Sequence, residues 1–222
     1  MKKSSLFLIF FLFFNLNELG LAKEASLDSS LDRIVAVVNN QIITNSELMR
    51  EQEGFKKQLD SSADAGKLKP EALRQKILKQ LIDETLQLQL AKQRGIAVSE
   101  KALDAAIADI AKRNKLSLSA FKDTVESHGL NYSDFRQRIR NQMIILRLQQ
   151  ASIGDSAQVS DQEVDSFLKD KQALKAVLQA YHIQKLNKTQ ARALLYERKL
   201  KVQADIFLEK LRAAAYIKMM PS

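Results

Sequence analysis

The stretch RIVAVVNNQIITNSEL, residues 33 to 48, determines how this chain begins its fold. Residues 33 to 38 are rich in Val and Ile, which favour β-strands. Asn39 and Asn40 tolerate the left-handed backbone conformations that a tight hairpin turn requires, and residues 41 to 44 form the expected return strand. The sequence therefore predicts a β-hairpin at this position.

Most of the remaining chain is predicted to be helical. Gly and Pro are few, at 6 and 2 residues, and such a composition favours helices. Thr44 to Glu47 has capping-box spacing, so a first helix is expected to run from there to about Leu59. Caps, glycines and apolar spacing predict further helices over residues 71–94, from Ser99 onward, over 118–127, from Asn131 onward, from Ser160 to about 178, and from Thr189 to about 212.

The end of the chain supplies another strand signal. AAYIKMM, residues 214 to 220, has alternating positions that would point to opposite faces of a sheet. A hairpin alone is marginally stable in water and exposes its edges. We therefore expect residues 216 to 220 to pair with the hairpin. The expected fold class is a mainly α helical domain with a small antiparallel sheet, formed by the N-terminal hairpin and the C-terminal strand.

Residues 1 to 22 have the pattern of a secretory signal peptide. Lys2 and Lys3 precede the apolar run LFLIFFLFF, residues 6 to 14, and small residues favour cleavage after Ala22. An uncleaved membrane anchor is the alternative. Nine apolar residues span only about 13 Å as a helix, whereas a bilayer requires about 20 residues. The chain has no Cys, which excludes a cysteine-acylated lipoprotein, so a soluble exported protein is expected.

The charge balance leaves the type of partner open. The formal net charge is +9, and it falls to +8 when the signal peptide is removed. Such a charge would suit nucleic acid, anionic lipid or acidic clients, and the export signal argues against nucleic acid. Four arginines fall on the helix expected after Asn131, where they either form a solvated face or attract acidic clients or lipid. These are Arg136, Arg138, Arg140 and Arg147.

The sequence contains little that suggests catalysis or metal binding. It has two His, no Cys and no acidic cluster at ligand spacing, so neither a metal site nor a cofactor is expected. The glycine-rich motifs that bind nucleotides and the elbow motif of serine hydrolases are absent. His128 is interpreted as a residue at a helix end, and His182 as a strand residue.

Three stretches resemble the SurA-type periplasmic chaperones, the SurA N-terminal domain family. They are DRIVAVVNNQIITNSEL (32 to 48), GLNYSDFRQRIRNQMII (129 to 145) and FLEKLRAAAYIKMM (207 to 220). The resemblance covers residues 32 to 165 and, less closely, residues 180 to 220. It implies a chaperone core built from an N-terminal helical region and a C-terminal helix and strand. In that family, one or two parvulin-type prolyl isomerase domains sit between these two parts.

The chain departs from the family pattern where an isomerase domain would stand. Fewer than 30 residues separate Glu163 from the terminal helix, too few for a parvulin domain. AYHIQKL, residues 180 to 186, resembles the closing strand of such a domain, and we interpret residues 180 to 188 as the stub of a lost one. The protein is therefore not expected to be an enzyme. A residual peptidyl-prolyl cis-trans isomerase and a helical secreted adaptor that binds one specific partner are the alternatives.

The resemblance implies an ATP-independent periplasmic holdase that binds unfolded outer-membrane β-barrel proteins and assists their assembly. The expected partners are these clients and the outer-membrane assembly machinery, with no nucleic acid and no stable membrane insertion. Clients would bind in a cleft between the two ends of the chain, and an ordinary core position is the alternative for each residue proposed to line it. These residues are Met49, Phe55, Leu59, Phe207 and Leu211.

The expected organisation has five parts. It comprises a signal peptide (1–22), a disordered N-terminus (23–31), a SurA-like N-terminal helical chaperone region (32–179), the parvulin stub (180–188), and a C-terminal helix and strand that pack back on the N-terminal region (189–222).

Overall fold

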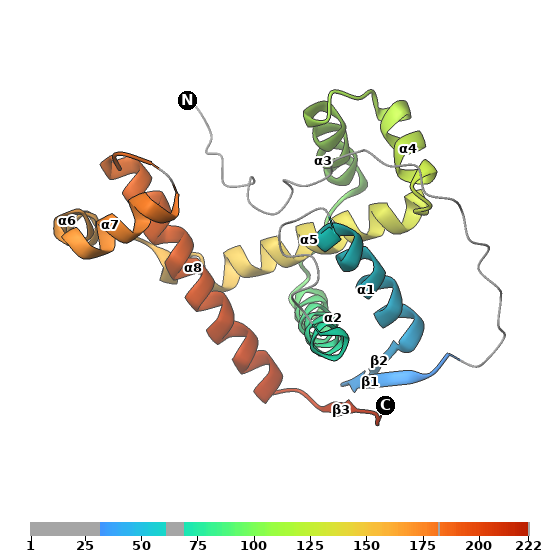
Figure 1. The fold of residues 1–222 in the computed structure, drawn as a ribbon. Helices are drawn as coiled ribbons and strands as arrows, with labels where there is room; N and C mark the ends of the chain where they lie inside the picture. Colours follow the sequence, from blue (N-terminus) through green and yellow to red (C-terminus); the bar gives the residue numbers. More distant parts are fainter. Residues whose placement is uncertain (1–31, 61–68, 182, 222) are drawn as a thin grey trace. The chain divides into compact units, whose positions relative to one another are not determined.

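A computed structural model describes residues 32 to 60, 69 to 181 and 183 to 221 (Figure 1). Outside the described residues lie the predicted signal peptide, the polar segment that follows it and most of the loop before Pro70. His182 also lies outside them. Within these ranges the chain forms eight α-helices, one short 3-10 helix and three strands. They fall into two compact units, one made of the residues up to Ile82 and those from Tyr216 on, and the other of Asp83 to Ala215.

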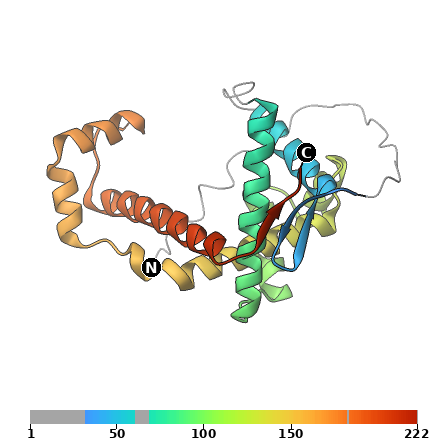
Figure 2. The ribbon, with the colours of Figure 1, turned by 90° about the horizontal axis from the view of Figure 1, so that it is seen from below.

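The first unit contains a three-stranded antiparallel sheet in which β1 is the central strand. The strands are β1 (Ile34–Val38), β2 (Gln41–Thr44) and β3 (Ile217–Met219), in the order β2-β1-β3. Val38 pairs with Ile217, and Val37 pairs with Lys218. Figure 2 shows the C-terminal strand alongside the hairpin. The predicted closure of the hairpin by the end of the chain is confirmed, and so is the fold class.

The hairpin turn follows from its two asparagines. Asn39 has a φ of 54°, the left-handed conformation that Asn tolerates better than most residues. One face of the sheet is buried. Helix α1 (Asn45–Asp60) packs against β2, and α1 and the early residues of α2 (Pro70–Gln93) belong to the same unit as the sheet. The buried side chains of the first unit are Val35, Ala36, Val38, Ile43, Leu48, Leu73, Ile77, Leu81 and Ile82.

The start of α1 is capped from two positions. The Glu47 amide donates to the hydroxyl of Thr44, as the capping-box spacing predicted, and the Ser46 amide donates to the carboxylate of Asp32 at 3.0 Å. The Asp32 pKa is lowered by the hydroxyl of Thr44 and then by the Ser46 amide. These bonds satisfy amides that the first turn of a helix leaves without partners.

In the second unit, three helices surround one apolar cluster. They are α3 (Glu100–Arg113), α4 (Leu118–Ser127) and α5 (Tyr132–Ile153), with α3 and α4 both packed on α5 (Figure 1). Ser99, Ser117 and Asn131 cap them, and Gly95 and Gly129 have the positive φ that lets the chain turn between helices. The buried members of this cluster are Val98, Leu103, Ile107, Ala111, Phe121, Val125 and Ile139.

The rest of the second unit forms a smaller cluster around the last helix. After the 3-10 helix η1 (Asp155–Ala157) come α6 (Asp161–Lys169), α7 (Lys171–Ala180) and α8 (Lys188–Ala213). The sequence predicted one helix from Ser160 to about residue 178, and this is wrong. Asp170 divides it, because its carboxylate accepts bonds from the amides of Gln172 and Ala173 and so caps a second helix. The buried members of this cluster are Val164, Phe167, Val177 and Ala191.

The connection between α7 and α8 also differs from expectation. The segment expected to resemble a parvulin strand is not one, since Ala180 ends α7 and residues 183 to 187 are irregular. The Ile183 amide donates to the carbonyl of Leu178 at 3.0 Å, which folds the chain back against the helix end. Asn187, and not Thr189, caps α8 through a reciprocal capping box with Gln190. The interpretation of residues 180 to 188 as a lost isomerase's remnant stays a prediction.

Candidate binding surface

The uncovered face of the sheet carries one row of side chains, of which two are apolar and one is a lysine. Because paired residues in an antiparallel ladder point to the same side, Ile42, Val37 and Lys218 lie next to one another across the three strands. Ile42 is 55% exposed, although its neighbour Ile43 is buried on the covered face. The sheet therefore presents apolar surface to solvent on the side away from its core.

The outer edge of β3 has backbone groups available for pairing. The Asn39 amide donates to the Tyr216 carbonyl at 2.7 Å, and the Met220 amide donates to the Val35 carbonyl at 2.9 Å. Residues in an antiparallel pair alternate between facing the partner strand and facing away. The amides and carbonyls of Ile217 and Met219 therefore point away from β1, and within the described residues β3 has no strand on that side.

The predicted site residues of the first unit lie on α1. Met49 is 51% exposed, and its sulfur accepts a hydrogen bond from the Asn45 side chain at 3.3 Å. Phe55 is half-buried, and the Lys76 ammonium lies 4.7 Å from the centre of its ring. The backbone of Leu59 lies in the last turn of α1, and its side chain is outside the described set. Of the two whose side chains are described, Met49 is the more exposed and so has the surface that a binding residue requires.

The other two predicted site residues lie on α8 in the second unit. Phe207 and Leu211 are both half-buried, so they are neither plain core positions nor freely exposed. Val202, on the same helix, is more exposed, at 55%. Because Met49 and Phe207 belong to different units, the cleft predicted between the two ends of the chain stays a prediction.

Sequence reasoning did not single out three of the most exposed apolar side chains as site residues. Ile42, Tyr216 (60% exposed) and Met219 (65% exposed) belong to β2, the start of β3 and β3 itself. The signal that could have indicated them is the short β-segment at each end of the chain. A three-stranded sheet covered on one side must leave its second face and its outer strands accessible.

The arginines of α5 are used within the second unit. Arg136 bonds Asp104 at 2.6 Å and Glu100 at 3.0 Å, and Arg140 also bonds Glu100. The pKa of Arg136 is raised, chiefly by its hydrogen bond to Asp104. Arg147 donates to the carbonyl of Ala97. These three side chains therefore tie α5 to α3 and to the segment before it, and are not available as a basic face for acidic clients.

Two further observations limit the chemistry of the described residues. His128 is the C-cap of α4, as predicted, with its ring 2.6 Å from the carbonyl of Thr124. Among the described residues no group of His, Cys, Asp or Glu is placed to hold a metal ion. None of the helices that the structure describes combines the length and the apolar character needed to cross a membrane.

Comparison with known sequences points to one family. The profile of the SurA N-terminal domain matches residues 31–149. Chaperone SurA of Legionella pneumophila (strain Lens) is 37% identical over 157 residues, which are 70% of this chain and 36% of the relative. Chaperone SurA of Alcanivorax borkumensis is 43% identical over 138 residues, 62% of this chain and 32% of the relative. The matched part of the chain thus spans about a third of the length of these relatives.

A solved structure supports the same fold. A chain from a study of two structurally related SurA-like chaperones of Campylobacter jejuni, the virulence factor PEB4 and the periplasmic protein Cj1289, aligns with a TM-score of 0.58 at 16% identity. The alignment covers 85% of this chain and 99% of that one. The matched residues 31–149 begin just before β1 and end within α5. The chain belongs to the SurA N-terminal domain family.

Proposed function

We propose that the protein is an ATP-independent periplasmic holdase that keeps unfolded outer-membrane β-barrel proteins from aggregating and assists their assembly. The observation that carries this proposal is that three elements of the first unit, α1, β2 and β3, each expose an apolar side chain to solvent. Ile42, Met49 and Met219 are each more than half exposed, and β3 has an open edge. The names of the relatives as chaperones, and the predicted signal peptide, support the same function and the same compartment.

The chemistry of this surface suits the proposed client class. Strands of an outer-membrane barrel alternate apolar and polar residues, so an unfolded barrel segment can place every second side chain on an apolar surface. Its backbone can also bond to an open strand edge. Met side chains adapt to varied partners because they are flexible and polarisable. Met49, Phe55, Leu59, Phe207 and Leu211 remain the proposed client contacts, to which we add Ile42 and Met219.

An aggregation assay tests this function. The mature protein at micromolar concentration, without nucleotide, should suppress the aggregation of an unfolded porin diluted from denaturant. The double variant Ile42→Lys/Met49→Lys should suppress it markedly less, because it places charges at two of the proposed client contacts. Both side chains are exposed, so the fold should survive. Val202→Lys, which alters an equally exposed side chain on α8, is the matched control. An inactive wild-type protein would contradict the proposal.

Cross-linking in cells distinguishes a holdase from an adaptor. A photo-activated residue at Met49 or Phe207 should capture a range of outer-membrane proteins, because a holdase recognises a pattern and not one sequence. Capture of a single stoichiometric partner would instead favour the secreted adaptor. A peptide proline-isomerisation assay should show no rate above background, and a measurable rate would revive the enzyme alternative.

A further inference from the structure

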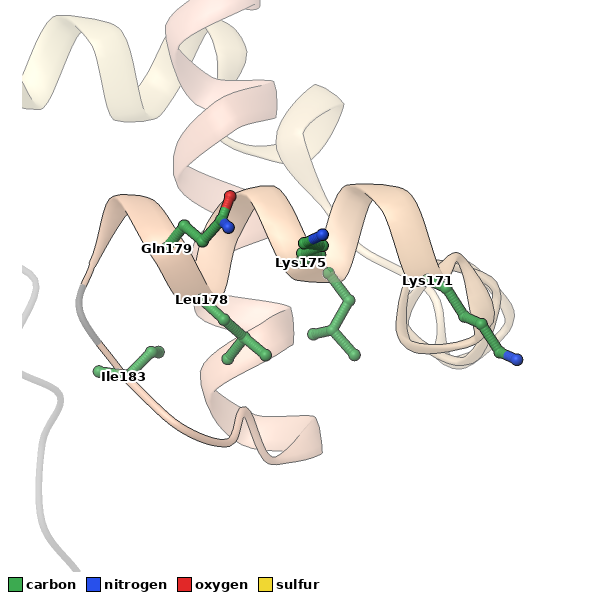
Figure 3. A pocket seen from close by; sticks show the side chains of 6 residues that line it. Lys171, Lys175, Leu178, Gln179 and Ile183 are labelled. Atoms are coloured by element: carbon green, nitrogen blue, oxygen red, sulfur yellow. The ribbon is translucent and has the colours of Figure 1, made fainter.

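The helix α7 borders an open apolar groove outside the surface described above. Leu174 and Leu178, one helical turn apart, line it together with Ile183 from the connection that follows the helix. The groove has a volume of about 310 Å³. Figure 3 shows Ile183 beside Leu178, where the chain returns past the end of the helix. Small-molecule sites begin at about 300 Å³, so this groove could accept one large apolar side chain.

Two lysines give the groove a charge. Lys171 and Lys175 also line it, and both are exposed. Within the part of the chain that the structure describes, neither ammonium group has an ion-pair partner. Lys188 and Arg192, further along the chain, differ because Lys188 pairs with Asp165 at 2.6 Å and Arg192 pairs with Asp161.

The local sequence accentuates this charge. From position 171 to position 196 there are five basic residues and no acidic one. The nearest carboxylate before the groove, that of Asp170, is occupied by two amides of its own helix. The charges of Lys171 and Lys175 beside the apolar groove are therefore not neutralised by any acidic residue of positions 171 to 196. A negatively charged occupant would neutralise them.

We propose that this groove binds a peptide segment in which one aromatic or large aliphatic side chain is flanked by acidic residues. The apolar side chain lies on Leu174, Leu178 and Ile183, and the flanking carboxylates pair with Lys171 and Lys175. A second copy of this chain is a poor occupant, because the protein is itself strongly basic. The site deepens the proposed holdase function, on which it rests for its biological role, by adding a preference for acidic and apolar client segments.

Labelled peptides test the site directly. A fluorescein-labelled ten-residue peptide with one Phe between Asp and Glu should bind the mature protein in a fluorescence-anisotropy titration, and more weakly as salt is added. The same peptide with Lys in place of its acidic residues, or with Ser in place of Phe, should bind at least about fivefold more weakly, because each lacks one of the two kinds of contact.

Protein variants locate the binding. Lys171→Glu/Lys175→Glu should weaken the acidic peptide about tenfold, because two attractions become two repulsions. Lys201→Glu/Lys210→Glu makes the same change in net charge with exposed lysines of α8 that do not line the groove, and should leave the affinity unchanged. Ile183→Ser should weaken binding about fivefold, whereas Val202→Ser should not. Equal losses in the paired variants would overturn the assignment.

Two further outcomes separate this site from its alternatives. Anionic phospholipid is the other class of ligand that suits a basic and apolar helix face, so the binding of anionic vesicles is measured with the same variants. Loss of vesicle binding in Lys171→Glu/Lys175→Glu, with peptide binding intact, would overturn the peptide assignment. If the protein binds the peptide but does not protect porin, the holdase proposal is contradicted and the peptide site in the groove is still supported. If the protein protects porin but does not bind the peptide, the holdase proposal is supported and the peptide site is contradicted.

Discussion

Asn39 and Tyr216, at opposite ends of the chain, exchange two hydrogen bonds. The Asn39 amide donates to the Tyr216 carbonyl at 2.7 Å, and the Tyr216 amide donates to the Asn39 side-chain oxygen at 2.9 Å. The residue that turns the hairpin therefore also fixes the point at which β3 begins. Its positive φ and its side-chain acceptor are two separate contributions, and different substitutions remove them.

We expect Asn39→Ala to destabilise the first unit by about 2–3 kcal/mol. A left-handed conformation costs a residue with a Cβ about 1–2 kcal/mol, and the lost hydrogen bond about 1 kcal/mol. Asn39→Gly removes the acceptor but accepts the positive φ, so it should cost only about 1 kcal/mol. Denaturant titration gives the free energies of unfolding. Hydrogen exchange of the Met220 amide, which bonds Val35, reports closure of the sheet. Equal losses in the two variants would show that the backbone conformation is unimportant.

Proline substitutions in β3 should differ by position. Backbone groups of residues 216 and 220 bond to the chain of the hairpin, and facing alternates along a strand. The amide of Lys218 therefore faces β1, whereas the amide of Met219 faces outward. Lys218→Pro removes a ladder hydrogen bond, so it should cost about 1 kcal/mol more than Met219→Pro. Hydrogen exchange of the β1 amides measures the difference. Faster exchange in Met219→Pro than in Lys218→Pro would contradict the deduced strand orientation.

The ion pair between Arg212 and Asp83 should contribute more to the stability of the protein than the exposed ion pairs of the same unit. The Arg212 guanidinium meets both carboxylate oxygens, at 2.6 and 3.0 Å, and joins α8 to α2. The Asp83 side chain is only 14% exposed. Arg212→Ala should therefore cost about 2 kcal/mol, because it leaves a largely buried carboxylate without its partner.

Two further variants are controls for this pair. Arg212→Lys keeps the charge but not the two-pronged geometry, so it should cost about 1 kcal/mol. Arg192→Ala removes a pair whose Asp161 partner is 89% exposed, and should cost at most about 1 kcal/mol. Thermal unfolding followed by circular dichroism ranks the three. An Arg192 variant as unstable as the Arg212→Ala variant would show that burial does not determine the strength of these pairs.

The helix starts could largely be predicted from the sequence, and the break at Asp170 could not. Ser99, Asn131 and Ser160 stand directly before apolar spacing of helical period, and each is the observed cap. At Asp170, apolar positions continue on both sides with no Gly or Pro between them, so the pattern resembles one helix. In the structure the carboxylate of Asp170 caps the second helix, and the two shorter helices bury Phe167 and Val177 in one cluster.

The candidate surface was harder to predict than the fold. Residue type identified Met49 as adaptable, but exposure depends on which face of the sheet the helices cover. Ile42 and Ile43 are the same residue type, and their opposite environments follow from the register of β1 with β2. For the α5 arginines, the sequence suggested an exposed surface that the structure uses for internal contacts. Their spacing indicated a charged face, yet acidic residues of α3, more than 30 positions away in sequence, bind two of them.

Glu163 should make the stability of the second unit depend on pH below about 5. Its carboxylate accepts bonds from the Lys199 ammonium at 2.6 Å and from the amide and hydroxyl of Ser160, and these lower its pKa to about 2. The ordinary value is 4.5. Because the unfolded chain binds this proton more readily, the stabilisation is complete above pH 4.5 and is lost as the pH falls towards 2.

The variant Glu163→Gln isolates this contribution, because it keeps the shape of the side chain and removes the charge. The melting temperature of the wild-type protein should exceed that of the variant at pH 7, and the two should converge as the pH approaches 2. Asp165, whose pKa Lys188 lowers, changes in the same range but is present in both proteins, so it cancels in the comparison. A difference that stays constant from pH 7 to pH 2 would mean that the Lys199 contact acts through packing and not through the charge of Glu163.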